Sequence, residues 1–483
     1  MLPSIISHAK EYGFIFPSSE MYDGLQAVYD YGQYGIALKR NLQNLWWQTM
    51  TQLHPHIVGL DSAILMHPAV WKASGHVDSF ADLMVDNKDS KKRYRVDMLI
   101  ENHAEALTAA GQEDEAKQLL AQLQSLLQKD DLVGLHTLLL EAAITCPVAK
   151  TSHWTDVRKL NLMFATKVGA IESEADTIYL RPETAQGIYL NFLHVAHTAR
   201  MKVPFGIAQI GKAFRNEIVA RQFIFRMREF EQMEMQFFIQ PGTDKQWFDY
   251  WQNLRWQWYQ ALGIPKEKLK IKPHDQLAHY AQAAVDIEYQ FPFGYKEVEG
   301  IHARGDFDLK RHAQASRKKV QYFDPELNQS YIPHVVETSV GCDRLILMLL
   351  CEAFTQESQV ENGVSKERTY LKLHPALAPI KAAIFPLVKK DGLPAKAQQL
   401  FDALKYDFAL TYEENQSIGK RYTRQDLIGT PYCITIDHQT LEDDTVTLRH
   451  RDSMAQERVA ITSLQGFLTE TVSLKRILQD CHV

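Results

Sequence analysis

The sequence feature that most constrains the fold is a pair of stretches, 207–217 and 224–238, in which polar and apolar residues alternate. Within "FRNEIVARQFIFRMREFEQMEMQFF" (214–238), arginines and glutamates are interleaved with Phe and Met. A solvated surface does not need so many aromatic residues, and a core does not tolerate so many charges. Because strand side chains alternate between two faces, the pattern predicts two paired strands joined by a loop at 218–223, with one polar and one apolar face.

The polar face of this predicted hairpin carries the groups that a nucleotide and a cation need. Arg215 and Glu217 lie on it in the first strand, and Arg226, Phe230 and Glu234 lie on it in the second. The pairing places Arg215 opposite Arg226, which is unfavourable unless an anion lies between the charges. We therefore expect a polyphosphate between the arginines, a flat ring on Phe230 and an ammonium group near Glu234. The alternative is a helix over 226–236, because its residues are good helix formers.

A second candidate segment, 177–193, has the pattern of a strand, a proline break and a helix. Glu183 and Thr184 fall at the predicted start of that helix. Their side chains either belong to the same site or cap the free N–H groups of the first helical turn. The pattern leaves both interpretations open.

A third candidate segment, 331–354, has the pattern of a strand that ends at Gly341 and an apolar helix that follows it. Glu337 and Ser339 share one face of this strand. Arg344 lies in the first helical turn, where a positive charge opposes the helix dipole unless it serves an anion held there. The alternative is that the neighbouring Asp343 is its partner.

Glu297 and Glu299 lie in a strand-like segment at 293–309, with Arg304 beyond them. Period two places both carboxylates on one face, an arrangement that suits Mg²⁺. A solvated strand edge accounts for them equally well.

Composition and motifs disfavour several classes of protein. The longest apolar run, 345–350, is far shorter than the about 20 residues of a membrane span. The N-terminus shows no secretory signal, so we expect a cytoplasmic protein. The net charge of −6 argues against extended nucleic-acid coating but allows a local basic track.

The usual metal and phosphate motifs are also missing from the sequence. The five cysteines are scattered without a CxxC pair, which predicts reduced thiols and no zinc site. His194 and His197 form an HxxH with no second ligand pair, so surface or core histidines are the better interpretation. No Gly-rich phosphate loop of the Walker or Rossmann type is present.

Changes of texture along the 483 residues predict four regions. Helical spacing at 33–53 and a strand-like stretch ending at Pro68 fall in the first region, 1–85. Charged and then Ala/Leu/Gln/Glu-rich residues at 86–150 predict a mainly helical insertion. Sheet-forming runs fill 151–375, and prolines near its end precede an alternating α/β unit at 376–483.

Together these segments resemble the three signature motifs of the class II aminoacyl-tRNA synthetases, and among them the homodimeric glycyl-tRNA synthetases. The similarity covers nearly the whole chain. It is carried by strings that include "GFIFPSSEMYDGLQAVYDYG" (13–32), "YLRPETAQGIYLNF" (179–192), "PFGIAQIGKAFRNE" (204–217), "FIFRMREFEQMEM" (223–235) and "SIGKRYTRQDLIGTPYC" (417–433). Four residues depart from the family pattern without removing a charged site residue: Gln33, Ala170 and Ala220, where proline is usual, and Cys342, where Val or Ala is usual.

The resemblance implies an α+β fold in which an antiparallel sheet flanked by helices carries the active site. The catalytic domain would comprise 1–85, with motif 1 and the dimer interface, and 151–375, with motifs 2 and 3. Region 86–150 would be the helical insertion, and 376–483 would be an α/β anticodon-binding domain.

The resemblance also implies a set of site residues. ATP contacts are implied at Arg215, Asn216, Glu217, Arg226, Met227, Phe230, Glu297, Val298, Gly341 and Arg344, of which Arg215 and Arg344 are catalytic. Glycine contacts are implied at Arg95, Glu183, Glu234, Glu337 and Ser339. Glu297 is the candidate ligand of Mg²⁺. Lys420, Arg421 and Arg424 are candidates for contact with the tRNA anticodon stem, although a merely solvated basic patch is an open alternative.

The implied reaction is activation of glycine by ATP to glycyl-adenylate, followed by transfer to the 3′ end of tRNA-Gly for protein synthesis. The implied partners are ATP with Mg²⁺, glycine, tRNA-Gly and a second copy of the chain in a homodimer, without zinc, DNA or a membrane. One alternative is another class IIa synthetase, which would need a larger or differently charged amino-acid pocket. The three glutamates at 183, 234 and 337 argue against it. The other is a non-catalytic nucleic-acid-binding protein on the same scaffold, which could lose the motif arginines that are present here.

Overall fold

The computed structural model describes residues 1–169, 177–218, 222–274, 283–361 and 364–481. Backbone contacts divide the chain into two compact units. The first contains Met1–Ala63, Glu183–Lys212 and Phe230–Val483, and the second contains Ile64–Pro182 and Ala213–Glu229. Ala170 and Ala220, two of the departures noted above, lie outside the described residues.

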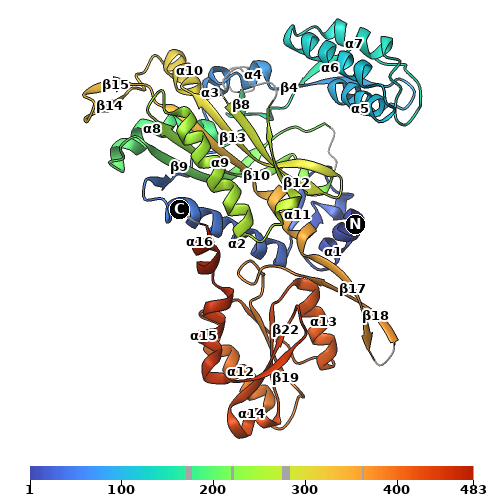
Figure 1. Ribbon diagram of the computed structural model, residues 1–483, viewed down its shortest axis with the longest axis vertical. Helices are drawn as coiled ribbons and strands as arrows, with labels where there is room; N and C mark the ends of the chain where they lie inside the picture. The colour runs from blue at the N-terminus through green and yellow to red at the C-terminus, as the bar shows by residue number, and fades with distance from the viewer. Residues whose placement is uncertain (170–176, 219–221, 275–282, 362–363, 482–483) are drawn as a thin grey trace. The chain divides into compact units, whose positions relative to one another are not determined.

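The first unit contains a seven-stranded sheet in the order β11-β12-β13-β16-β10-β9-β3. Figure 1 labels its strands β9, β10, β12 and β13. The five strands from β11 to β10 pair antiparallel, whereas β3 pairs parallel with β9. The strand bounds are β3 Ile57–Gly59, β9 Phe205–Phe214, β10 Glu229–Ile239, β11 Leu269–Pro273, β12 Ala283–Phe291, β13 Gly294–Gly305 and β16 His334–Gly341. The predicted antiparallel sheet is confirmed, with one parallel strand added at its edge.

Helices surround this sheet in the same unit. Their bounds are α1 Leu2–Glu11, α2 Gln33–Thr51, α8 Ala185–Thr198, α9 Asp244–Ala261, α10 Phe307–Ser316 and α11 Cys342–Ala353. Helix α2 begins where the spacing predicts, but the strand expected up to Pro68 is only the three residues of β3. Helix α8 packs on the sheet through Phe192, whose ring centroid lies 4.3 Å from that of Phe238.

The register of the sheet gathers polar side chains on one face. Glu337 of β16 lies opposite Gln236 of β10 on one side and opposite His302 of β13 on the other. Ser339 of β16 likewise lies between Glu234 and a glycine of β13. Because directly opposed residues point to the same side, these strands present a continuous polar surface, hereafter the polar face.

A β-bulge at Val298 overturns the prediction that Glu297 and Glu299 share a face. Glu299 pairs with Ile287 and Glu297 pairs with Glu288, which leaves Val298 without a partner in β12. An extra residue reverses the alternation on its far side, so Glu297 and Glu299 point to opposite faces. The predicted pair of Mg²⁺-binding carboxylates is therefore wrong.

The Glu299 side chain instead forms a buried ion pair with Arg255 of α9. Arg255 Nε lies 2.6 Å from Glu299 Oε1, and both side chains are at most 2 % exposed. The Arg255 guanidinium also lies 4.3 Å from the centroid of the Trp258 ring. Helix α9 is thus held to the face of the sheet that lies opposite the polar face.

We expect Glu299→Gln to destabilise the protein by about 3–5 kcal/mol, because it leaves the Arg255 cation buried without a counter-charge. Urea unfolding followed by tryptophan fluorescence measures the change. The matched control is Glu297→Gln, two residues away, which removes a half-exposed carboxylate and should cost less than about 1 kcal/mol. Equal losses in the two variants would contradict the bulge.

The C-terminal part of the first unit forms a five-stranded mixed sheet in the order β20-β19-β21-β22-β23. Its strands are β19 Ala382–Pro386, β20 Leu410–Tyr412, β21 Tyr432–Ile436, β22 Thr445–His450 and β23 Gln456–Ala460. Its helices are α12 Leu393–Leu404, α13 Ile418–Ile428, α14 His438–Asp443, α15 Ile461–Val472 and α16 Lys475–Asp480. The predicted alternation of strand, helix and strand after residue 380 is confirmed.

Smaller elements complete the first unit. They are the strand pairs β1 Ile15–Pro17 with β2 Tyr29–Tyr31, β14 Tyr322–Asp324 with β15 Gln329–Tyr331, and β17 Phe354–Glu361 with β18 Val364–Leu371, and the 3-10 helices η1 Glu20–Tyr22 and η4 Lys266–Lys268. Across the described residues of both units, no helix is long and apolar enough to cross a membrane.

The second unit combines two small sheets with five helices among its described residues. The sheets are β5-β4-β6 and β7-β8, with bounds β4 Ala81–Asp86, β5 Arg93–Arg95, β6 Arg158–Asn161, β7 Ala165–Lys167 and β8 Thr177–Tyr179. The helices are α3 Pro68–Ala73, α4 His76–Ser79, α5 Val96–Ala109, α6 Glu113–Gln128 and α7 Leu132–Glu141. Helices α5 to α7 share a core of buried leucines with Trp154, whose indole N–H donates to the carbonyl of Ile144 at 2.9 Å.

Candidate active site

Glu234 of β10 is a buried carboxylate on the polar face, with three hydrogen-bond donors around it. Thr184 Oγ1 donates to its Oε2 at 2.6 Å. Ser339 Oγ and Gln232 Nε2 donate to its Oε1 at 2.7 and 2.9 Å. Glu234 and Ser339, two of the implied glycine contacts, are therefore in direct contact with each other.

The contact of Thr184 decides between the two interpretations of the segment around Glu183. Thr184 occupies the N-cap position of α8, yet its side chain caps no N–H group of the helix. Its hydroxyl is directed to Glu234 instead. The simple capping interpretation is wrong for Thr184.

Glu337 of β16 is the second buried carboxylate of the polar face. Its Oε2 accepts from Gln236 Nε2 at 2.7 Å, and its Oε1 accepts from His302 Nδ1 at 2.9 Å. Arg304 Nη1 lies 3.3 Å from both of its oxygens. The charge of this carboxylate is thus met by a guanidinium and two further donors.

The two carboxyl groups have opposite pKa shifts. Burial raises the pKa of Glu234 to about 8, and the nearby charges of Glu337 and Glu183 add to this shift. Burial by itself would also raise the pKa of Glu337, but the Arg304 guanidinium and His302 lower it to about 2. Burial thus favours the neutral form of Glu234, which a cation in the site would shift toward the ionised form, whereas the Arg304 guanidinium favours the ionised form of Glu337.

Arg304 is aimed at Glu337 by a second bulge, since the register of β13 with β16 skips this one residue. Its Nε and Nη2 also donate to Asp308 at 2.8 and 3.1 Å. Asp308 accepts in turn from Gln186 Nε2 at 3.1 Å, and the same amide donates to Glu183 Oε1 at 2.8 Å. Glu183 and Glu337 are thus joined through one hydrogen-bonded network that fixes both side chains.

Arg344 of α11 pairs with Glu297 of β13, at 3.0 Å between Nη1 and Oε2. A Cβ on Gly341 would lie 3.1 Å from Arg344 Cδ, so the glycine leaves room for the arginine. Val298, between Glu297 and Glu299, is fully buried. Asp343 turns elsewhere and accepts from the hydroxyl of Tyr31, so it is not the partner that the alternative interpretation requires.

In the second unit, Arg215 lies directly after β9 rather than within it. Its backbone N–H donates to the carbonyl of Arg228 at 2.9 Å, and its Nε donates to the carbonyl of Pro182 at 3.1 Å. The guanidinium carbon lies 5.3 Å from the centroid of the Phe80 ring. The predicted opposition of Arg215 and Arg226 is wrong, because Arg228 occupies the position next to Arg215.

The strand predicted at 224–238 is shorter than expected for a local reason. A 3-10 helix, η3 Phe223–Phe225, follows Gln222, whose φ of 68° is left-handed, and β10 begins only at Glu229. Arg226 therefore does not share a strand face with Phe230 and Glu234. The alternative helix over 226–236 is also wrong, since most of that range is strand.

Charged side chains cluster around Arg226 and Arg95 in the second unit. Arg226 Nη1 lies 3.9 Å from Glu217 Oε2, and Arg95 Nη1 lies 3.3 Å from Asp82 Oδ1. Burial raises the pKa of Glu217 and of Asp82, and the surrounding arginines oppose this shift. Asp97, which also pairs with Arg95, completes an arrangement in which three carboxylates balance the arginine charges.

The remaining candidate ATP residues of this segment differ in exposure. Asn216 is exposed, and its backbone N–H donates to the carbonyl of Leu162 at 2.8 Å. Met227 is only 5 % exposed, whereas Phe230, the first residue of the chain segment that returns to the first unit, is half-buried.

Arg421, one of the three residues expected to form a basic patch for the anticodon stem, is buried. Arg421 is 1 % exposed, and its guanidinium donates to the backbone carbonyls of Pro386, Leu387 and Glu413. Lys420 and Arg424 are exposed on the same helix, α13. The prediction that Arg421 contacts a nucleic acid is therefore wrong.

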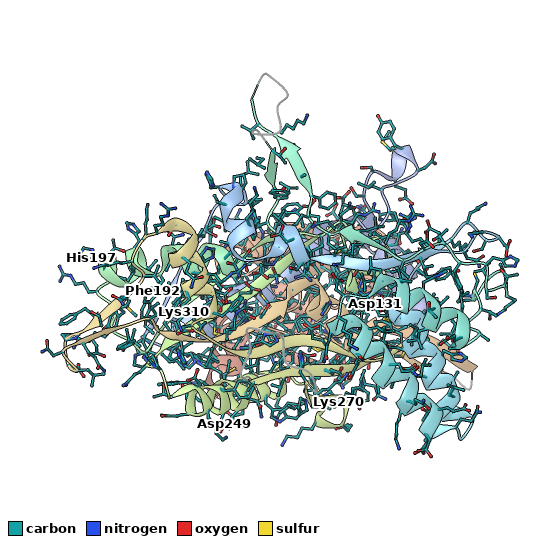
Figure 2. The ribbon with its side chains drawn as sticks, turned by 90° about the horizontal axis from the view of Figure 1, so that it is seen from above. Asp131, Phe192, His197, Asp249, Lys270 and Lys310 are labelled. Carbon is teal, nitrogen blue, oxygen red and sulfur yellow. The ribbon has the colours of Figure 1, made fainter. Side chains whose placement is uncertain are left out.

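The HxxH of α8 does not form a metal site among the described residues. His194 and His197 are both exposed, and Figure 2 shows His197 at the outer margin of the side chains. All five cysteines are free, as the scattered spacing predicts.

Several residues of the site were not singled out from the sequence: Gln186, His302, Asp308 and the role of Arg304 beside Glu337. His302 could be identified only from the strand register, which places it opposite Glu337 on the polar face. Arg304 could not be identified in this way, since its orientation depends on a bulge.

Three family models match the chain. They are described as the class II tRNA synthetase core domain for G, H, P, S and T at residues 166–353, glycyl-tRNA synthetase insertion domain 1 at 82–118 and 110–162, and an anticodon binding domain at 381–471.

Curated relatives match over nearly their whole length. The glycine–tRNA ligase of Chlorobaculum tepidum is 52 % identical over 466 residues, which cover 96 % of this chain and 98 % of that protein. The glycine–tRNA ligase of Macrococcus caseolyticus is 49 % identical over 473 residues, which cover 98 % of each chain. A protein of the same name from Staphylococcus aureus is 48 % identical over 471 residues, which cover 97 % of this chain and 98 % of that one.

Proposed function

Because the chain belongs to the glycine–tRNA ligase family of the class II aminoacyl-tRNA synthetases, we propose that the carboxylates of its polar face bind the ammonium group of glycine during ATP-dependent activation. The enzyme activity is the joining of glycine to tRNA at the expense of ATP. The observation that carries the residue assignment is the pair formed by Glu234 and Glu337 with Glu183 nearby.

In this proposal the glycine ammonium lies among Glu183, Glu234 and Glu337. A cation there favours the ionised form of Glu234, which is neutral in its own surroundings because burial raises its pKa. Ser339, Thr184 and their hydrogen bonds hold the Glu234 carboxylate in place. Arg95 is the further glycine contact that we carry over from the family resemblance.

Selection of glycine follows from size in the same proposal. Carboxylates fixed by hydrogen bonds around one ammonium occupy the space that the methyl group of alanine would need. Rejecting a larger substrate by steric clash is easier than rejecting a smaller one, so no separate editing domain is required.

ATP binding is proposed for the residues of motifs 2 and 3. Arg215 and Glu217 bind the α-phosphate and adenine, Arg226 contacts the phosphates, and Phe230 stacks on the base. Arg344 binds the γ-phosphate, with Gly341, Glu297 and Val298 lining the site and Asn216 and Met227 beside it. The support is that Arg226 and Arg344 each pair with a carboxylate while remaining partly exposed, so that a phosphate can compete for them.

Class II synthetases use ATP with a divalent metal, and we propose Mg²⁺ at Glu297. The half-exposed Glu297 carboxylate fits this ion, because Mg²⁺ usually takes one or two carboxylates together with substrate phosphates. When bound, the ion would neutralise charge on the phosphates. Glu299 is no part of this site, since it is buried against Arg255.

The proposed chemistry needs no activated nucleophile from the protein. The carboxylate of glycine attacks the α-phosphorus in line, the bond to the β-phosphate oxygen breaks, and pyrophosphate leaves. A hydroxyl at the 3′ end of tRNA-Gly then attacks the glycyl carbonyl and releases AMP. The protein contributes alignment and charge neutralisation, in which Arg215 and Arg344 are the catalytic residues.

We further propose that the chain acts as a homodimer in the cytoplasm, where tRNA is charged for protein synthesis. The segment of α2 and β3 is the candidate dimer element by its resemblance to motif 1. Residues 1–85 and 151–375 remain the proposed catalytic domain, 86–150 the insertion and 376–483 the anticodon-binding domain. Lys420 and Arg424 remain candidates for the anticodon stem, and no contact with DNA is expected.

The test is ATP–pyrophosphate exchange measured with each of the twenty amino acids in turn. Exchange with glycine alone is the expected result. Exchange with a different amino acid would keep the class and overturn the pocket assignment in favour of another class IIa synthetase. Silence with every amino acid, with tRNA added and the protein folded, would favour the non-catalytic binding protein.

A further inference from the structure

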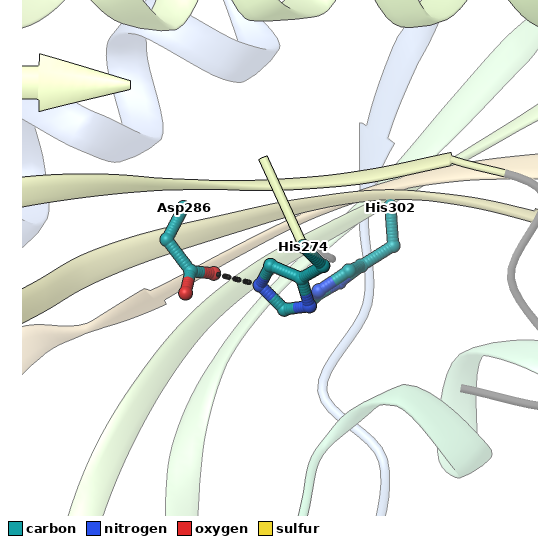
Figure 3. A group of neighbouring side chains, drawn as sticks. All are labelled: His274, Asp286 and His302. Carbon is teal, nitrogen blue, oxygen red and sulfur yellow. Dashed lines mark ion pairs between the residues drawn. The ribbon is translucent and has the colours of Figure 1, made fainter. Parts of the chain in front are cut away.

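Three side chains with metal-binding groups lie together on the outer part of the polar face (Figure 3). Asp286 belongs to β12 and His302 to β13, and His274 directly follows β11. The His274 backbone N–H donates to the carbonyl of Ala284 at 3.0 Å, and Ala284 lies opposite His302. The three residues are thus neighbours across three adjacent strands, although they are far apart in the sequence.

The distances within this group suit a single ion. One ligand atom from each residue can be chosen so that all three lie within 4.8 Å of one another. His274 Nε2 lies 2.9 Å from Asp286 Oδ1, yet among the described residues this buried nitrogen has no partner with hydrogen-bond geometry. The ring centroids of His274 and His302 are 5.8 Å apart at an interplanar angle of 73°. An ion pair joins His274 and Asp286, and His302 adds a second imidazole beside them.

The other nitrogen of His302 is already fixed in the way that a metal ligand requires. His302 Nδ1 lies 2.9 Å from Glu337 Oε1, and Glu337 also accepts from Gln236, so the carboxylate acts as the acceptor. Nδ1 therefore carries the hydrogen, and Nε2 is the ring nitrogen that remains for an ion. Histidines that bind metals usually donate their second N–H to a carboxylate in this manner.

A glycine beside His302 keeps the ring in this place. A Cβ on Gly300 would lie 2.7 Å from His302 Cε1, which is closer than side chains approach one another. Gly300 lies opposite Asp286 in the register of β12 and β13. The backbone thus leaves open the volume that His302 fills next to Asp286.

We propose that His274, Asp286 and His302 form a binding site for one Zn²⁺ ion per chain. Two imidazole nitrogens and one carboxylate are a ligand set for zinc with a fourth position left to water. Mg²⁺ and Ca²⁺ prefer oxygen ligands alone, so this set selects a first-row transition metal over the ion that accompanies ATP. The sequence motifs did not indicate this site, because the ligands are spread over three strands.

The site has a consequence for the glycine pocket, and this part rests on the proposed function. An ion on Nε2 of His302 would hold the ring that donates to Glu337. His302 then acts as a positioning residue for a carboxylate that binds the glycine ammonium. Removing zinc should raise the KM for glycine several-fold and leave the KM for ATP unchanged.

The test measures zinc binding by the full-length protein, independently of its activity. Protein stripped with a chelator is dialysed against Zn²⁺, and the bound metal is quantified by mass spectrometry. The site variants are His274→Ala and Asp286→Asn, neither of which contacts Glu337. The control is His334→Ala, because His334 also lies between carboxylates, at 2.8 Å from Asp244, but has no second imidazole beside it in the described structure.

We expect one equivalent of zinc in the wild type and in the control. Each site variant should lose affinity by more than about 100-fold, beyond the range for residues that only support a ligand. Circular dichroism checks that the variants are folded. If only one of the two site variants folds, that variant is sufficient for the comparison with the wild type. Absence of stoichiometric zinc in the wild type, or zinc affinity equal to that of the wild type in both folded site variants, overturns the site. Zinc binding at these residues without a change in the KM for glycine overturns only the coupling to Glu337.

Discussion

Glu234→Gln is expected to lower kcat/KM for glycine in ATP–pyrophosphate exchange by about 30-fold to several thousand-fold. Removing one member of a buried charge pair costs about 2–5 kcal/mol, and each 1.4 kcal/mol is a factor of about ten. Glutamine keeps the shape of the side chain and resembles the neutral form that Glu234 takes in its buried surroundings. The fold should therefore survive, and the loss should appear in the glycine dependence rather than in the ATP dependence.

Glu234→Gln should also change the number of protons released when glycine binds. Burial, with Glu337 and Glu183 nearby, raises the pKa of Glu234 to about 8, whereas a bound ammonium favours the ionised form. Glycine binding at pH 7 should then release up to one proton, and glycine affinity should rise with pH toward 8 by at most about tenfold per unit. Calorimetry in two buffers of different ionisation enthalpy counts these protons. Glu234→Gln should release none.

The control for both readouts is Glu288→Gln. Glu288 is a buried carboxylate of the same sheet that pairs with Lys270 and Lys272, away from Glu234 and Glu337. It should leave the KM for glycine and the proton count unchanged. An unchanged KM in Glu234→Gln, or a loss as large in Glu288→Gln, would count against Glu234 as the ammonium ligand.

Local patterns in the sequence were sufficient for much of this fold. Helix α2, strand β16 and helix α11 lie where helical spacing and alternation predict them, and so do strands β19, β21 and β22 and helix α12 of the C-terminal part. The shared face of Glu337 and Ser339 follows from period two alone. These elements are long or regular, so tertiary contacts do not override their pattern.

The errors occur where the backbone departs from a regular period. Val298 and Arg304 occupy bulges, and an extra residue in one strand leaves no mark in the alternation of that strand. Strand β10 begins later than the alternation predicts, because the left-handed Gln222 and the 3-10 helix at 223–225 interrupt a stretch whose residues still alternate. Register with the neighbouring strand decides such cases, and register is not visible in one strand alone.

The spacing of residues in α13 indicates that Arg421 is buried, although its charge favours a position on the surface. Within α13, Arg421, Gln425 and Ile428 are spaced as one helical face, and all three are buried. Arginine is rarely buried, so its charge favours the interpretation as surface. Backbone carbonyls accept its donors here, and such acceptors cannot be located from the sequence.

Arg215→Ala is expected to slow glycine-dependent pyrophosphate exchange by about 10²–10³-fold, the usual cost of removing one group that stabilises charge in a transition state. The loss should fall on kcat, because the α-phosphate gains charge only as the reaction proceeds. The matched control is Arg158→Ala, since Arg158 is an arginine of the same unit whose side chain is 62 % exposed. It should leave exchange unchanged. Thermal melting of both variants checks that the fold is intact.

A purely structural role for Arg215 leads to a different outcome, which the same measurements detect. Arg215 Nε holds the carbonyl of Pro182, and Pro182 directly precedes Glu183 in the chain. If the arginine acted only through this contact, Arg215→Ala would shift Glu183 and raise the KM for glycine while kcat at saturating glycine stayed close to that of the wild type. Arg215→Lys separates the roles further, because lysine keeps a positive charge for the phosphate but lacks the forked donors of the guanidinium. If Arg215→Lys restores exchange relative to Arg215→Ala and neither variant changes the KM for glycine, Arg215 acts on the phosphate.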